Sequence, residues 1–297
     1  YSMDLFGFDF AKIILGLVIW VSIGLSLTLL SNSLQIKPFF MGLILSIFIF
    51  KQSFLGHETI LDAVEAKTIA YPLVITAIYF AINAKWKISI ILFILATSIH
   101  FLVGAFWGFS ILLLFLLNKF SLKKILIIVP IFILFAMSSF YIIYSDIALT
   151  IINTGTSEPI KFGNNIGDSL TTVANIYSSF RVPHHVAPFS KNLNYILIWI
   201  QGVLSHISLA IIILILLKKS SEKFQVIGKW LIFLNLYIVI AIFISFVDRH
   251  TNVYSVLYMF RPSSLIYLLS IMFIVSTFQK IIKEDSIIIA SIIALII

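Results

Sequence analysis

Residues 195–217 read YILIWIQGVLSHISLAIIILILL. This run holds no lysine, arginine or carboxylate, and at about 1.5 Å of rise per residue it would form a helix about 35 Å long. The hydrocarbon layer of a membrane is about 30 Å thick, so the run is long enough to cross it. Similar apolar runs occupy 125–144 and 230–247. They predict an α-helical membrane protein.

The composition of the whole chain supports the same prediction. Of 297 residues, 61% are hydrophobic and 11% are charged, whereas a soluble domain carries about 25% charged residues. We therefore expect the lipid bilayer to be the solvent. The net charge of +8 does not indicate nucleic acid, because the lysines lie in short breaks between apolar runs, where they set membrane orientation. The absence of cysteine excludes disulfides and thiol chemistry.

The apolar runs divide the chain into about ten expected transmembrane helices, which form a single polytopic domain over residues 1–297. The first residue is Tyr1, and the last run is too short to span, so we expect a fragment at both ends. The expected segments are 10–34, 38–54, 68–84, 88–101, 102–117, 125–144, 194–217, 229–247, 262–278 and 286 onward.

Every second break between these segments is rich in lysine. The breaks concerned hold Lys37, then Lys85 and Lys87, then Lys119, Lys123 and Lys124, then Lys218, Lys219, Lys223 and Lys229, and last Lys280 and Lys283. Cytoplasmic loops carry such an excess of positive charge. We therefore predict a multi-pass protein of the bacterial inner membrane, with these breaks in the cytoplasm.

The opposite breaks, 1–9, 51–67, 145–193 and 248–261, are then extracytoplasmic, and 145–193 is a long loop of the kind that is usually functional or disordered. All three arginines, Arg181, Arg249 and Arg261, fall in these breaks. The positive-inside rule favours arginine on the cytoplasmic side. A planar guanidinium suits phosphate, which suggests a function for the outward arginines; a small sample from a lysine-biased composition is the alternative.

Three carboxylates follow the second expected helix. Glu58, Asp62 and Glu65 stand at i, i+4 and i+7, so they would share one face if the segment were an interfacial helix. They are candidates for a general base or for a site that holds a divalent cation, and a solvated polar face is the alternative. Lys67 is placed to pair with Glu65 or to extend to the membrane interface.

Residues 180–188 read FRVPHHVAP, and this segment is the preferred site. It places Arg181, His184 and His185 between prolines. Adjacent histidines in an extended chain point to opposite sides, and no nearby carboxylate completes a ligand set, so anion or phosphate recognition is favoured over metal binding.

Two further groups of polar residues complete the candidates. In the last outward break Arg249 and His250 follow Asp248, and Arg261 lies at a helix start; they would bind phosphate or anchor the helices at the interface. His206 lies within an expected span, where it is either functional or a neutral imidazole bonded to a neighbouring helix.

Several segments together resemble the GT-C class of membrane glycosyltransferases, in particular its bacterial relatives. They are FLGHE at 54–58, EAKTIAY at 65–71, the stretch from KWK at 85–87 to HFLVG at 100–104, and FRVPHH at 180–185. The resemblance implies a multi-helix membrane enzyme that takes a sugar from a polyprenyl phosphate or pyrophosphate carrier on the extracytoplasmic side. A glycan or a protein would be the acceptor.

The class usually places an essential acid in its first outer loop, which would precede Tyr1, and relatives often have arginine where Lys67 stands. A carboxylate base would deprotonate the acceptor hydroxyl while cations stabilise the departing phosphate. By this hypothesis Glu58, Asp62 or Glu65 supports the base or a divalent cation. The expected phosphate ligands are Lys67, Arg181, His184, His185, Arg249, His250 and Arg261.

Three other functions fit the same pattern. An O-antigen-type polymerase or ligase also uses outward arginines and a long outer loop, and would differ in making repeats. A flippase or transporter of lipid-linked glycans would need a continuous polar route to the cytoplasmic face, although no acid lies near the middle of an expected span. A non-enzymatic assembly subunit would lack converging acid and base residues.

Overall fold

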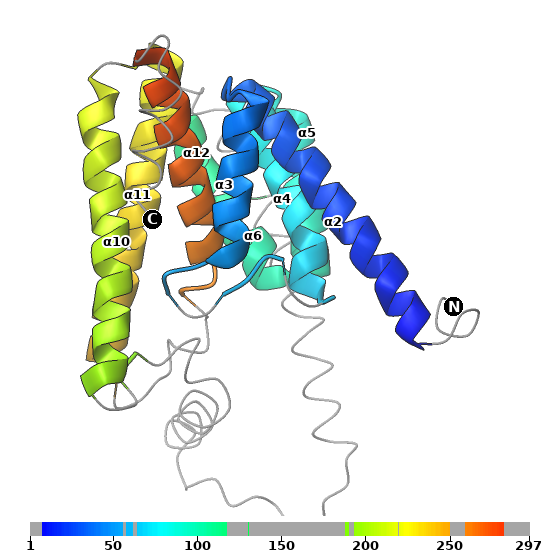
Figure 1. The fold of residues 1–297 in the computed structure, drawn as a ribbon, viewed down its shortest axis with the longest axis horizontal. Coiled ribbons are helices and arrows are strands. Elements are labelled where there is room, and N and C mark those ends of the chain that lie inside the picture. Colours follow the sequence, from blue (N-terminus) through cyan, green and yellow to red (C-terminus); the bar gives the residue numbers. More distant parts are fainter. Residues whose placement is uncertain are drawn as a thin grey trace, which may run out of the picture.

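The computed structural model describes residues 8–55, 58–61, 64–117, 130, 188–189, 193–218, 220–249 and 259–281. Within these residues the chain forms eight helices and no strand (Figure 1). The helices are α2 (Phe8–Ser33), α3 (Pro38–Phe50), α4 (Ala66–Ile82), α5 (Trp86–Ile99), α6 (Phe101–Leu117), α10 (Leu193–Leu217), α11 (Glu222–Val247) and α12 (Ser263–Ile281).

Four of these helices are long and apolar enough to cross a membrane. Their spans are Phe10–Ser33, Leu193–Leu217, Glu222–Val247 and Ser263–Lys280, and the other four helices are shorter but also apolar. The prediction of an all-helical membrane protein is confirmed for the described residues. Each expected segment in them coincides with a helix. The segments 125–144, apart from Pro130, and 286 onward lie outside the described residues.

Helix α12 forms the centre of the bundle. It contacts α10 and α11 on one side and α3 on the other (Figure 1). Of the residues Ser263–Lys280, 83% are buried. Small hydroxyl side chains allow this close packing, because each can bond to a nearby carbonyl. Ser276, for example, donates to the carbonyl of Leu34, and Thr277 donates to that of Phe273 at 2.9 Å.

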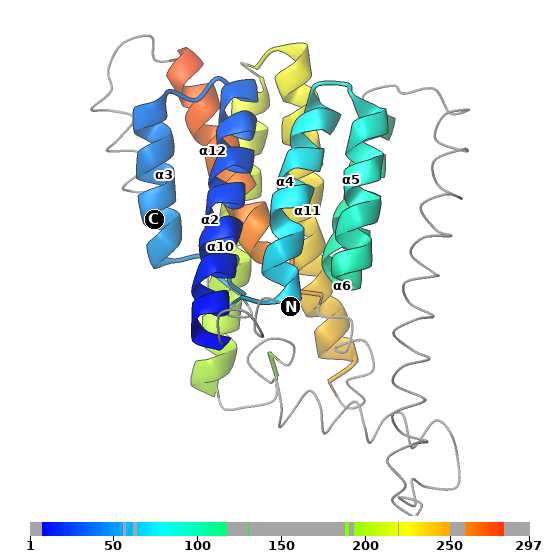
Figure 2. The same cartoon turned by 90° about the vertical axis from the view of Figure 1, so that its right-hand side faces the viewer.

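Helix α4 organises a second group, in which it contacts α2, α5 and α6. Helices α5 and α6 are joined by His100 alone and run antiparallel as a tight pair (Figure 2). Gly104 permits this approach, since a Cβ there would collide with the backbone of Thr97 and Ala96. The outer faces of α2, α10 and α11 expose large apolar residues such as Leu17, Leu204 and Phe243, as expected of surfaces that contact lipid.

The helix connections separate into two ends (Figures 1 and 2). The α2–α3, α4–α5 and α10–α11 connections and the end of α12 lie together, and we name this the lysine end. The α3–α4 connection, the α5–α6 junction and the start of α12 lie at the other, the Glu58 end. The alternation predicted from the lysines therefore corresponds to the observed arrangement of the described helices.

The described residues around 58–65 do not form the interfacial helix considered for this region. Residues 51–55, 58–61 and 64–65 are not helical, and α4 begins only after Glu65. The amide of Gln52 provides the physical reason. Its oxygen accepts hydrogen bonds from the N–H groups of Ile60 and Leu61, each at 2.7 Å, and its nitrogen donates to the Leu61 carbonyl at 2.9 Å. These backbone groups are paired with a side chain instead of with a helical turn.

Candidate functional site

Glu58 is the centre of an ionic cluster at the Glu58 end. The residue is 1% exposed, and its carboxylate lies between two cations. Its Oε2 is 3.6 Å from the Lys67 Nζ, and its Oε1 is 3.6 Å from the Arg261 Nε. Burial of a carboxylate is costly unless positive charge compensates it. The cluster joins three parts of the chain. Glu58 comes from the loop before α4, Lys67 from the first turn of α4, and Arg261 from the segment just before α12.

The connection between α3 and α4 carries Glu58, and we name it the Glu58 loop. The start of α12 holds this loop in place by hydrogen bonds to its backbone carbonyls. Ser264 donates to the carbonyl of Glu58 at 2.5 Å, and Ser263 donates to that of Leu55 at 3.2 Å. The Ser53 hydroxyl shares a further hydrogen bond of 2.9 Å with Ser263. Because these bonds fix the backbone, the position of the Glu58 carboxylate does not depend on its ion pairs alone.

Lys67 connects the buried carboxylate to the surface. Its Nζ is also 3.3 Å from Oε2 of Glu65, whose side chain is 52% exposed. The predicted pair of Lys67 and Glu65 is thus present. Glu65 caps α4 reciprocally with Thr68, whose hydroxyl accepts from the Glu65 N–H at 3.0 Å. This capping box fixes the start of α4 and therefore the direction of Lys67.

Arg261 connects the cluster to the α5–α6 junction. Its Nη1 is 3.0 Å from Nε2 of His100. A guanidinium can only donate, so Nε2 accepts and the imidazole is neutral. Burial and the nearby Arg261 guanidinium both favour this state and lower the pKa of His100 to about 4. The hydroxyl of Tyr71 donates to the Arg261 carbonyl at 3.4 Å.

The described charges of this cluster are unevenly distributed in depth. Lys67 and Arg261 face one buried carboxylate, while the second carboxylate, on Glu65, lies at the surface. Among the described groups, the interior part therefore holds two cations and one carboxylate. A carboxylate there can accept a proton, and cationic donors beside it can hold an anionic group.

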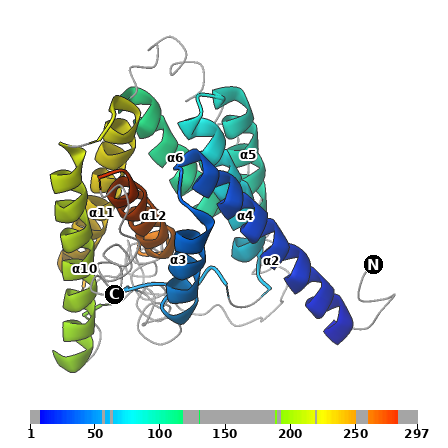
Figure 3. The same ribbon diagram turned by 45° about the horizontal axis from the view of Figure 1, so that its top comes forward.

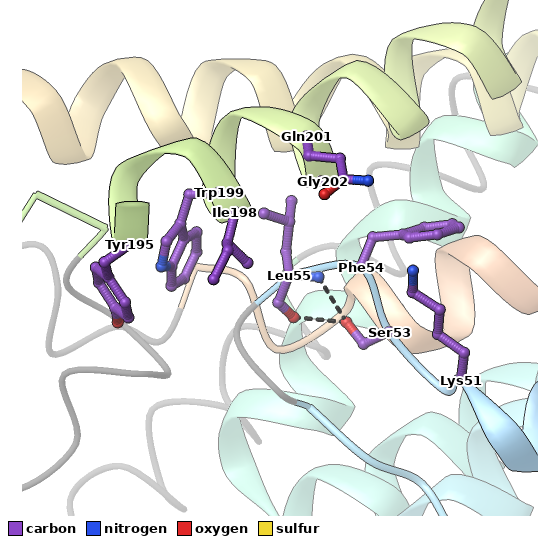
Figure 4. Close-up of a pocket in the computed structure, with 9 residues that line it drawn as sticks. All are labelled: Lys51, Ser53, Phe54, Leu55, Tyr195, Ile198, Trp199, Gln201 and Gly202. Atoms are coloured by element: carbon purple, nitrogen blue, oxygen red, sulfur yellow. Dashed lines mark hydrogen bonds between the residues drawn. The ribbon is translucent and has the colours of Figure 1, made fainter. Parts of the chain in front are cut away.

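A cavity of about 180 Å³ lies between residues 51–55 and α10 (Figure 4). Aromatic and apolar side chains dominate its wall, and the polar groups come from Lys51, Ser53, Tyr195 and Gln201, a composition typical of ligand pockets. The lining residues are Lys51, Ser53, Phe54, Leu55, Tyr195, Ile198, Trp199, Gln201 and Gly202.

The cavity and the ionic cluster share structural elements. Trp199 from the cavity wall packs edge-on against Phe260, with ring centroids 4.8 Å apart, and Phe260 precedes Arg261. Gly202 lets α10 approach the loop, because a Cβ there would lie 2.5 Å from the Phe54 carbonyl oxygen. A ligand in the cavity would therefore contact the same loop that carries Glu58.

Arg249 contacts its own helix, α11, and makes no described ion pair with this cluster. Its guanidinium lies 4.4 Å above the Phe246 ring and donates to the Phe246 carbonyl at 2.9 Å, so it has the contacts expected of interfacial anchoring. His206 is fully buried, and its Nδ1 lies 2.8 Å from Oδ1 of Asn235. His206 in α10 thus bonds to the neighbouring helix α11, which is one of the two roles expected for it from the sequence. Asp62, Arg181, His184, His185 and His250 lie outside the described residues.

Two members of the cluster were not predicted as site residues: His100 and Tyr71. The sequence marks both only as parts of segments that carry the resemblance, and the contact of His100 with Arg261 spans 161 positions. Within the described residues, no three His, Asp or Glu side chains gather as metal ligands. The divalent cation therefore stays a prediction.

The sequence matches no protein family model, and neither a curated protein nor a solved structure is similar to it at a significant level.

Proposed function

We propose that this chain is a multi-pass glycosyltransferase of the bacterial inner membrane. It moves a sugar from a polyprenyl phosphate or pyrophosphate carrier to an acceptor on the extracytoplasmic face. The observation that carries the proposal is the Glu58 carboxylate, buried between Lys67 and Arg261. This cluster lies at the end of the bundle opposite the lysine-rich connections, which is the extracytoplasmic end if those connections face the cytoplasm.

The chemistry of the proposed transfer requires an acid-base group and a cation. A bond forms between the acceptor oxygen and the anomeric carbon, while the bond from that carbon to the phosphate oxygen breaks. Glu58 takes the proton of the acceptor hydroxyl, and Arg261 and Lys67 stabilise the charge on the departing phosphate. Their contacts with Glu58, at 3.6 Å, are longer than the 2.7–2.9 Å or so of a charge-assisted hydrogen bond. An incoming phosphate would compete with Glu58 for both cations.

The neighbouring cavity supplies a place for the saccharide. Tyr195 and Trp199 offer aromatic faces, and Gln201 and Ser53 offer hydrogen-bonding groups. Ile198 lines the cavity and is 56% exposed on the outer face of α10. A polyprenyl chain would lie against this apolar face in the bilayer while its head group reaches the Glu58 loop.

Replacement of Glu58 by glutamine tests the proposal, because glutamine keeps the shape of the side chain and removes the base. The full chain is placed in vesicles with a radiolabelled polyprenyl-phosphate sugar and extracted envelope glycans, and labelled product is measured. We expect Glu58→Gln to lower turnover by about 10²-fold or more. Glu222→Gln, a matched change at the lysine end, should keep wild-type turnover.

Unfolding temperatures of both variants separate a chemical role from a structural one. If Glu58 only holds the loop, Glu58→Gln will lower stability while the folded fraction turns over normally, and that result rejects the proposed base. An absence of product from the wild-type chain with every polyprenyl donor rejects glycosyl transfer. Product length distinguishes transfer of one sugar from the repeats that a polymerase makes.

A further inference from the structure

A second cavity lies at the lysine end, at the end of the bundle opposite the Glu58 cluster. Its volume is about 420 Å³. It lies between the α2–α3 connection, the α10–α11 connection and the end of α12. Figure 3 shows α12 between α11 and α3. Its lining residues are Ser33, Gln35, Ser220, Ser221, Lys223, Phe224, Thr277 and Lys280.

Two lysines line this cavity, and its described lining residues include no carboxylate. The Lys223 Nζ donates to the side-chain oxygen of Asn83 at 3.2 Å, and the Lys280 Nζ lies 3.3 Å from the ring centroid of Phe224. Neither lysine forms an ion pair with another described residue. Two ammonium groups on one cavity repel each other, and an anion between them would relieve that repulsion.

The start of α11 adds further donors to the same cavity. Ser221 precedes the helix in an extended conformation, and its side chain makes no capping hydrogen bond. The first N–H groups of a helix lack partners within it and carry partial positive charge, which attracts anions. The hydroxyl of Ser221 also lines the cavity, whereas the hydroxyls of Ser220 and Thr277 already donate to the carbonyls of Leu216 and Phe273. Ammonium groups, helix amides and the Ser221 hydroxyl in one cavity suit a ligand with several anionic oxygens.

We infer that this cavity binds a phosphate group. The group comes from the head of an anionic phospholipid or from a soluble phosphate ester, and both offer the same oxygens to Lys223 and Lys280. A lipid source fits the position of the cavity at the helix ends, where basic pockets between transmembrane helices bind anionic head groups. The inference does not depend on glycosyl transfer, because it rests on residues at the other end of the bundle.

The test uses the full chain in lipid nanodiscs and measures its unfolding temperature. One arm compares nanodiscs of phosphatidylcholine alone with nanodiscs that also contain phosphatidylglycerol. The other arm keeps phosphatidylcholine alone and adds inorganic phosphate or glycerol 3-phosphate to the solution. We expect a rise in unfolding temperature in at least one arm, since a ligand that binds only the folded state stabilises it, and the responding arm identifies the source.

Two double variants make this result specific. The cavity variant, Lys223→Gln with Lys280→Gln, should lose the rise or need at least about tenfold more ligand, a difference of about 1.4 kcal/mol. The control variant, Lys85→Gln with Lys87→Gln, removes the same charge from the α4–α5 connection, which does not line the cavity. It should respond like the wild type.

A single Lys280→Gln variant guards against misfolding of the double variant, because Lys280 has a ring contact but no side-chain hydrogen bond to another described residue. Its response should be reduced while its unfolding temperature in phosphatidylcholine stays near that of the wild type. If no arm produces a rise, or if cavity and control variants respond equally, the cavity does not bind phosphate.

Discussion

The two ends of the bundle hold charge in opposite ways. At the Glu58 end a buried carboxylate pairs with Lys67 and Arg261, and serines of α12 bind the loop that carries it. At the lysine end Lys223 and Lys280 contact only neutral groups among the described residues. Buried charges must be compensated within the protein, whereas charges near water or lipid head groups can be compensated from outside. The first end is thus suited to a preorganised site and the second to an anionic partner.

Among the changes that test this contrast, Arg261→Ala should cause the largest loss of unfolding free energy. It removes one of the two described cations beside a carboxylate that is 1% exposed, and breaking a buried pair in this way costs about 3–5 kcal/mol. Equilibrium unfolding in mixed micelles measures the loss. Arg249→Ala is the matched control, since the Arg249 guanidinium lies over an exposed ring and should cost less than about 1 kcal/mol. Equal losses would show that the Glu58 end is not internally compensated.

A smaller effect is expected from glycine replacements at the two ends. Gly104→Ala should destabilise the chain by about 1–3 kcal/mol, because its Cβ would meet the Thr97 backbone and force apart the α5–α6 pair that positions His100. Gly42→Ala, near the lysine end of α3, has open space and should be neutral or stabilising, since alanine favours helix. The unfolding free energies of both variants, measured under the same condition, test this difference. A tolerated Gly104→Ala would contradict the tight packing of the Glu58 end.

Acidification should affect the Glu58 end through His100. Its pKa is about 4 in the folded chain and 6.5 ordinarily, as a result of burial and the Arg261 guanidinium. Between these values the unfolded chain binds a proton that the folded chain does not. Stability from the neutral imidazole is therefore complete above about pH 7 and falls as the pH decreases toward 4, by at most about 1.4 kcal/mol per pH unit.

The replacement His100→Gln isolates this contribution. It should make unfolding free energy less dependent on pH between about 6.5 and 4 than in the wild type, as measured by unfolding at matched pH values. Lys87→Gln, at the other end, should keep the wild-type dependence. Identical profiles for His100→Gln and the wild type would show that His100 is not held neutral in the folded chain.

The helices could be predicted from sequence because their signal is local. Expected segment 102–117 corresponds to Phe101–Leu117, and expected segment 194–217 corresponds to Leu193–Leu217. The start of α11 was placed at 229 but lies at Glu222, since hydropathy counts Lys223 and Lys229 as a break although lysine favours helix. Apolar periodicity finds the part of a helix that lipid contacts, and it misses polar turns beyond that part.

The cluster could be predicted only in part. Glu58, Glu65, Lys67 and Arg261 were candidates because their charges lie beside apolar runs, yet their pairing depends on helix packing. The pattern of three acids at helical spacing was misleading in one respect, since Gln52 takes the backbone hydrogen bonds of that segment. A side chain that takes backbone hydrogen bonds from residues eight positions away leaves no periodic pattern in the sequence. The contact of Arg261 with His100 likewise requires the folded arrangement.

The smallest effect should come from exposed lysines at the lysine end. Lys85 and Lys87 are exposed, and their ammonium groups lie 5.8 and 5.7 Å from the centroids of Phe80 and Trp86. Replacing both with glutamine should change unfolding free energy by less than about 1 kcal/mol, and salt should reduce even that difference, because exposed charges are screened. Unfolding at low and high ionic strength measures it. A large, salt-insensitive loss would mean that these lysines are compensated inside the chain, as Lys67 is, and the contrast between the two ends would no longer hold.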